Sequence, residues 1–112
     1  MVVKVKQGEN FTPCIKLTHK KTGAPVDLTG CTAYSQMRTA PNGELIATGN
    51  CIIDYPNGRI TVQYDSQTTN EIPLGNYGYD VWLLPDGDQN AKRPIWTEEV
   101  TIIGRYTDEF GA

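Results

Sequence analysis

The sequence has few of the residue patterns on which enzyme active sites are built. Its one histidine, His19, stands beside Lys20 and Lys21, where an exposed imidazole of ordinary behaviour is expected. It contains no Gly-x-Gly-x-x-Gly, Gly-x-x-x-x-Gly-Lys or Gly-x-Ser-x-Gly motif, so no phosphate-binding loop and no serine nucleophile is indicated. We therefore predict a protein that is not an enzyme and that takes no cofactor and no small-molecule ligand.

Cysteine is also scarce, and its spacing argues against both a metal site and a disulfide scaffold. Cys14, Cys31 and Cys51 are odd in number and lie far apart, with no Cys-x-x-Cys pair among them. Each falls in or beside a strand-like segment, where cysteine usually serves as a small buried hydrophobic residue. We predict three free, structural thiols and folding in a reducing compartment.

The acidic residues are candidates for a metal or glycosidase site, but their pattern is weak. Asp86-Gly87-Asp88 places oxygen-bearing side chains at alternate positions, as a calcium loop does, yet no acidic residue follows to close the loop. A turn is the better interpretation there. The other candidate acids are Asp54, Asp65 and Asp80, of which Asp80 lies within a predicted strand and is expected to face solvent. No metal site is predicted.

No basic surface and no long apolar segment are indicated. Thirteen acidic against ten basic residues give a net charge of −3, whereas nucleic-acid-binding proteins are usually basic. Lysines interrupt the valines of residues 1–6, so that segment is neither a secretory signal nor a membrane span. We expect neither nucleic acid nor membrane as a partner, and synthesis in a cytoplasm.

What the sequence does contain is a series of short alternating segments separated by turn residues. Residues 31–39 alternate with small residues on the predicted inner face: Cys31, Ala33, Ser35 and Met37. Asn42-Gly43 and residues 56–58 predict hairpin turns, and residues 65–72 predict one helical turn capped by Asp65. Residues 45–48 and 51–55 form either one bulged strand or two, and Pro13 makes residues 11–17 an edge strand.

Residues 74–85 carry the strongest structural signal. Leu74-Gly75-Asn76-Tyr77 is typical of a tyrosine corner, in which the Tyr77 hydroxyl bonds to an upstream backbone carbonyl. Tyr79, Val81 and Leu83 then share the inner face, which leaves Trp82 outside with Gly78 and Asp80. About seven strands at spacings of about ten residues predict one all-β domain over residues 1–112, an antiparallel immunoglobulin-like β-sandwich.

Exposed aromatic residues and sheet edges are the remaining candidates for function. We predict an interface that includes Trp82, Asp80, Trp96 and Ile102, because an exposed tryptophan on a sheet marks either a protein interface or a platform for stacking sugars. Trp82 packed under a loop or against Trp96 is the structural alternative. The segment 100–103 is apolar enough to attract a partner strand, whereas lysines in residues 2–6 discourage uncontrolled pairing.

Four sequence motifs resemble those of one protein family: Gly8-Glu9-Asn10-Phe11, Asp27-Leu28-Thr29-Gly30, Gly58-Arg59-Ile60-Thr61-Val62 and Gly75-Asn76-Tyr77-Gly78-Tyr79-Asp80. Together they make residues 5–104 similar to small bacteriophage virion proteins and to the N-terminal domain of phage baseplate upper proteins. The resemblance implies an immunoglobulin-like fold and a structural or adaptor role without catalytic residues. The long extension of a full baseplate upper protein is absent here, so a stand-alone virion protein is expected.

Two functional hypotheses follow from the residues and the resemblance. The first is a non-enzymatic phage or prophage virion protein of the tail, baseplate or head, made in the bacterial cytoplasm and assembled with other virion proteins or with itself. The second is a module that binds carbohydrate or a host-surface ligand through an aromatic face. A tight oligomer without glycan affinity favours the first, and a monomer that binds glycan favours the second.

Overall fold

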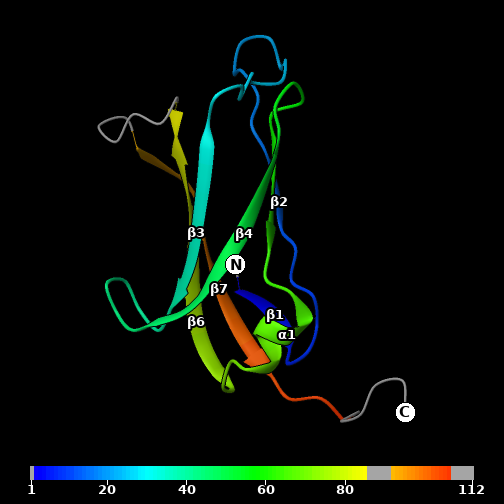
Figure 1. The fold of residues 1–112 in the computed structure, drawn as a ribbon, viewed down its shortest axis with the longest axis vertical. Helices are drawn as coiled ribbons and strands as arrows, with labels where there is room; N and C mark the ends of the chain where they lie inside the picture. Colours follow the sequence, from blue (N-terminus) through cyan, green and yellow to red (C-terminus); the bar gives the residue numbers. More distant parts are fainter. Residues whose placement is uncertain (1, 86–91, 107–112) are drawn as a thin grey trace.

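The structure is a computed structural model that describes residues 2–85 and 92–106, and seven strands dominate it (Figure 1). In chain order the strands are β1 (Val2–Lys6), β2 (Cys14–Lys16), β3 (Thr32–Arg38), β4 (Leu45–Asp54), β5 (Arg59–Gln63), β6 (Gly75–Leu84) and β7 (Arg93–Ile103). One short helix, α1 (Ser66–Asn70), lies between β5 and β6. Residues 45–54 form a single strand rather than two.

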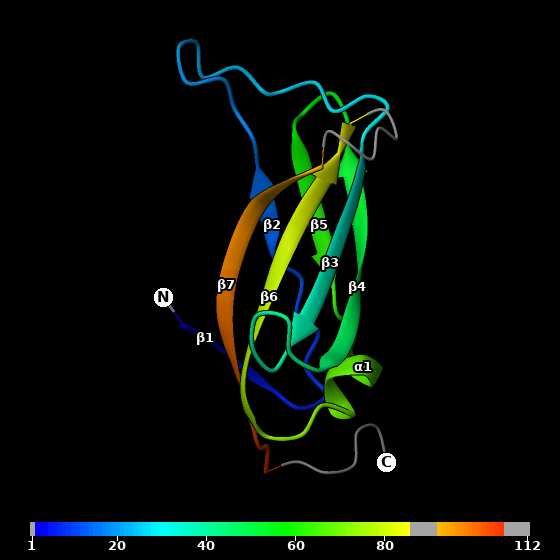
Figure 2. The same cartoon turned by 90° about the vertical axis from the view of Figure 1, so that its left-hand side faces the viewer.

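The strands form one mixed sheet in the order β1-β7-β6-β3-β4-β5-β2, curled into a half-barrel (Figures 1 and 2). The curl depends on β4, whose first half pairs with β3 and whose second half pairs with β5. Gly49 lies where β4 changes partner. A Cβ atom there would lie 2.8 Å from Val62 Cγ1 and 2.9 Å from Tyr64 Cζ, so only glycine lets these side chains pack against the bend.

The all-β class is confirmed, whereas the strand pairing differs from two separate antiparallel sheets. The long β4 belongs to both halves of the curled sheet and joins them into one. In addition, β1 pairs in parallel with β7, from Val2 opposite Glu99 to Lys6 opposite Ile103. The prediction of an entirely antiparallel arrangement is therefore wrong at this edge. Parallel neighbours require a long connection, and here most of the chain lies between the two strands.

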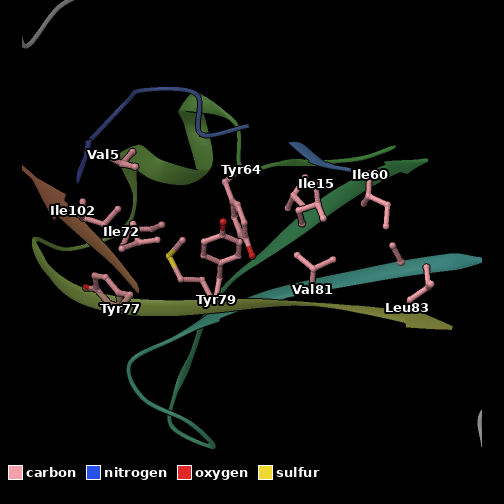
Figure 3. Close-up of a cluster of buried hydrophobic side chains, with 14 of the residues drawn as sticks. Val5, Ile15, Ile60, Tyr64, Ile72, Tyr77, Tyr79, Val81, Leu83 and Ile102 are labelled. Carbon is pink, nitrogen blue, oxygen red and sulfur yellow. The ribbon is translucent and has the colours of Figure 1, made fainter. Parts of the chain in front are cut away.

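The hydrophobic core fills the concave side of the sheet (Figure 3). The predicted alternation is confirmed, since the buried residues occupy every second position: Ala33, Ser35 and Met37 on β3, Ile60 and Val62 on β5, and Tyr79, Val81 and Leu83 on β6. Tyr64 is fully buried, and its hydroxyl lies 2.7 Å from Ser35 Oγ. Every buried side-chain nitrogen and oxygen in the described residues has a hydrogen-bond partner.

Local signals in the sequence account for the connections. Asp65 caps α1 by accepting a hydrogen bond from Thr68 N at 2.8 Å, and the hydrogen bonds from Thr68 lower the pKa of the Asp65 carboxyl. The Tyr77 hydroxyl donates to the Pro73 carbonyl at 2.7 Å, which is the backbone contact predicted for the corner. Asn42 and Gly58 adopt φ angles of 60° and 63° at the two predicted hairpin turns.

Candidate functional site

Tyr34 and Trp82 lie side by side on the convex, outer face of the sheet. Tyr34 on β3 is directly opposite Trp82 on β6 in the antiparallel register, so both rings point away from the core. They remain 53% and 37% exposed. Trp82 Nε1 donates to Asp80 Oδ2 at 3.0 Å, which fixes the orientation of the indole ring. The predicted placement of Trp82, Asp80 and Gly78 on one face is confirmed.

A broad groove of about 1110 Å³ runs over this face from Trp82 to the β3–β4 turn. Beyond the two rings, its floor is polar. Gln36 lies opposite Asp80, and Arg38 lies opposite Gly78, which in turn lies opposite Glu99 on β7. Residues 39–42 contribute the wall at one end, and Figure 3 shows this turn on the side of the sheet away from the core.

Arg38 is held in place at the centre of the groove. Its two terminal nitrogens donate to the Gly43 carbonyl at 2.8 Å and to Gln36 Oε1 at 2.9 Å. The first bond joins the strand to the turn, and the second joins two neighbouring side chains of the floor. The groove therefore has a positively charged group of defined position, and its floor also carries the Asp80 and Glu99 carboxylates.

Gly78 leaves a hollow between Arg38 and Glu99. A Cβ atom at this position would meet a single atom within 4 Å, the Glu98 carbonyl oxygen at 3.8 Å. Its backbone does not adopt a positive φ angle. Neither a close neighbour nor a positive φ angle requires glycine here. A glycine within a strand weakens the strand and marks a bulge, a tight bend or a place where a ligand comes close, and a register shift lies at Arg38, opposite Gly78.

Trp96 lies on the opposite side of the sheet from Trp82. It pairs with the inward-facing Val81, and its Nε1 donates to the Tyr79 hydroxyl at 3.1 Å. That hydroxyl donates in turn to Glu98 Oε1 at 2.7 Å, and burial raises the pKa of Tyr79 well above its usual range. The two tryptophans do not pack together, so the part of the alternative that placed Trp82 against Trp96 is wrong. Trp96 is 42% exposed at the open margin of the half-barrel.

Among the residues that the structure describes, about half of the outer edge of β7 has no strand paired with it. Strand β1 covers residues 99–103 of β7, but no strand of the described residues pairs with the outer edge of residues 93–98. The expectation of a free apolar edge at residues 100–103 is therefore wrong. Ile102 is 2% exposed, with β1 on one side and β6 on the other, and it is not available to a partner.

The other predicted residues are scattered. His19 is exposed in a turn at which its own N–H donates to the Ala24 carbonyl. All three thiols are free as predicted, yet Cys14 is exposed rather than buried, because the first and third residues of β2, Cys14 and Lys16, face outward on either side of the buried Ile15. Burial raises the pKa of Cys51. Asp86 and Asp88 lie outside the described residues.

Residues 2–85 and 92–106 contain no group of three or more His, Cys, Asp or Glu side chains placed to hold a metal ion. Within the same residues, no helix is long and apolar enough to cross a membrane. No protein-family model matches the chain, and no curated protein matches it in sequence.

Sequence reasoning missed the partners of Trp82. Alternation placed Trp82 outside, but the neighbour Tyr34 belongs to a strand more than forty residues earlier, and only the pairing of β3 with β6 brings the rings together. The same holds for Arg38 and Glu99 on either side of Gly78. The one available signal was Gly78 itself, a glycine within a strand with no turn to explain it.

Proposed function

We propose that this protein is a non-enzymatic structural component of a phage or prophage particle that assembles through the free edge of β7, residues 93–98. The resemblance carried by residues 27–30 and 75–80 supports the virion assignment. The proposal includes an immunoglobulin-like fold, in which the two halves of the curled sheet act as the two packed layers of a sandwich. The resulting domain would work in the virion, after synthesis in the bacterial cytoplasm.

The observation that carries the assembly proposal is the unpaired edge itself. Gln7 N donates to the Ile103 carbonyl on the β1 side of β7. Because backbone groups alternate along a strand, the N–H and C=O of Thr97 point to that same side, where no described strand receives them. Exposed Trp96 lies beside them. Backbone donors next to a large aromatic ring favour the addition of a strand from another chain.

The partner that suits this edge best is a second copy of the same chain. The edge has a base at one end, Arg93, and an acid at the other, Glu98. Two such edges in antiparallel orientation bring Arg93 of each copy to the Glu98 end of the other, and the two Trp96 rings come together near the two-fold axis. A symmetric pair of this kind closes on itself.

The edge is also built to limit pairing. Pro94 has no N–H, and a register shift in the β6–β7 pairing leaves Ile95 without an opposite residue, so a partner strand can be only short. The two outermost strands are protected as well, β1 by Lys4 and Lys6 and β2 by its length of three residues. Association is therefore expected to stop at a defined size.

Light scattering after size exclusion tests this proposal. We expect wild type to form a concentration-dependent, saturable dimer that changes little with salt, because backbone hydrogen bonds and apolar burial dominate. Trp96→Ala and Ile95→Lys should be monomeric, while Trp82→Ala, on the other face, should dimerise normally. A wild type that stays monomeric at millimolar concentration would contradict the proposal.

A further inference from the structure

We propose that the groove on the outer face, floored by Tyr34, Trp82 and Gly78, is a binding site for a neutral oligosaccharide. The site adjoins the β7 edge of the proposed assembly, since Thr97 and Glu98 also line the groove, but its two rings lie on the face of the sheet opposite Trp96. It would give the protein a recognition function in addition to a structural one. The argument rests on the two rings, the hollow at Gly78 and the balance of charge around them.

The two rings form a fixed apolar platform. Opposite residues of an antiparallel pair have Cβ atoms about 5 Å apart, so Tyr34 and Trp82 present adjoining ring surfaces. The hydrogen bond from Trp82 Nε1 to Asp80 holds the indole before any ligand arrives, which reduces the ordering cost of binding. A pyranose ring has an apolar C–H face that stacks on such a platform and a rim of hydroxyl groups that does not.

The rest of the floor is suited to that hydroxyl rim. Asp80 and Glu99 supply hydrogen-bond acceptors, Arg38 supplies donors, and the Gln36 amide supplies both. The bonds from Arg38 to Gln36 and to the Gly43 carbonyl hold the Arg38 and Gln36 side chains in place before a ligand binds. Sugar hydroxyls both donate and accept, and so they can satisfy this mixture without a net charge.

Gly78 supplies the independent sign that a ligand approaches the sheet. Neither its φ angle nor any close neighbour demands glycine, and the missing side chain leaves a hollow between Arg38 and Glu99. A glycine within a strand often marks a place where a ligand comes close to the backbone. The hollow lies two rows along the strands from the rings, or about 14 Å by strand geometry, so one ligand can span both only if it is a chain of sugars.

Other ligand classes fit the groove less well. A nucleic acid or other polyanion would be repelled by Asp80 and Glu99 and by the net charge of −3. The core of a protein interface is depleted of charged residues, whereas here charged groups occupy the middle of the floor and the rings lie at one end.

A printed array of neutral oligosaccharides, followed by calorimetry with the tightest binder, tests the proposal. We expect wild type to bind, and Trp82→Ala to weaken binding at least tenfold. Gly78→Val should weaken it as much by filling the hollow, yet its denaturation midpoint should equal or exceed that of wild type. The matched control is Tyr55→Ala, which removes an exposed aromatic ring outside the groove and should bind normally.

The outcomes separate this proposal from the assembly proposal. If wild type binds no oligosaccharide on the array, or if Gly78→Val and Trp82→Ala bind as wild type does, the glycan site does not exist. A change of oligomeric mass in Trp82→Ala would mean that the outer face is a protein interface, which also overturns it. Trp96→Ala should retain the affinity of wild type per site, so a failure of assembly leaves this test intact.

Discussion

The inner and outer faces of β3, β6 and β7 belong to the same strands but obey different rules. On the inner face Met37, Val81 and Val100 are buried, and every buried side-chain nitrogen or oxygen of the described residues has a hydrogen-bond partner. On the outer face Tyr34 and Trp82 stay exposed, and Gly78 leaves space that no packing requirement explains. Residues on the inner face are therefore explained by stability alone, and those on the outer face call for a function.

The largest expected difference in stability is between substitutions of two β3 residues that lie on opposite faces of the sheet. Met37→Ala should cost about 2–5 kcal/mol of unfolding free energy, because it opens a cavity in a fully buried site. Tyr34→Ala, on the exposed face of the same strand, should change stability by less than about 0.5 kcal/mol. Chemical denaturation of both variants measures the difference. Equal losses would show that the outer face is packed as the inner face is.

Two glycines within strands provide the next comparison. Gly49→Ala should cost about 1–3 kcal/mol, because the added methyl group would collide with Val62 and Tyr64. Gly78→Ala should instead gain about 0.5–1 kcal/mol, since alanine suits a strand better than glycine and meets open space here. The denaturant midpoints of the two variants show whether each substitution raises or lowers the free energy of unfolding. A destabilised Gly78→Ala would give this glycine a structural role and weaken the argument for a ligand.

The corner at Tyr77 is expected to contribute a smaller amount. Tyr77→Phe removes the hydrogen bond to the Pro73 carbonyl and keeps the inward-facing ring, so the loss should be about 1 kcal/mol. Urea denaturation with Asn76→Ala as the exposed neighbour checks it. An unchanged midpoint in Tyr77→Phe would mean that the turn before β6 is fixed by other contacts.

The smallest effect concerns the rate of thiol modification. Cys51 is half-buried, and burial raises its pKa, so its thiolate is rarer at neutral pH. Cys14 is exposed on β2. Alkylation of the native protein, followed by mass spectrometry, should modify Cys14 first and Cys51 more slowly. Denaturation should make all three thiols react alike, and a faster native reaction at Cys51 would contradict the burial of that side chain.

Alternation along single strands was enough to predict the inner face. Ala33, Met37, Val81 and Leu83 are buried as their period of two indicates, and the turns at Asn42 and Gly58 follow from local backbone preference. Such signals act between near neighbours in the chain, so one sequence is sufficient to recognise them. The capped helical turn after Asp65 belongs to the same class.

Contacts between distant segments could not be predicted in this way. The apolar residues around Ile102 suggested an edge that attracts a partner, but the strand that covers them is β1, at the other end of the chain. The pairing of Tyr34 with Trp82, and of Arg38 with Gly78, also depends on strand order. Nothing in a single strand specifies its neighbour in a sheet, so half of the candidate site became visible only in three dimensions.

The central claim is that the two tryptophans serve two separate surfaces, Trp82 the outer face and Trp96 the free edge of β7. The most direct test measures dimer mass and oligosaccharide affinity together in Trp82→Ala and Trp96→Ala. We predict that Trp82→Ala loses oligosaccharide binding at least tenfold and remains a dimer, while Trp96→Ala becomes a monomer and keeps its affinity per site. Loss of both properties in either folded variant would contradict the account.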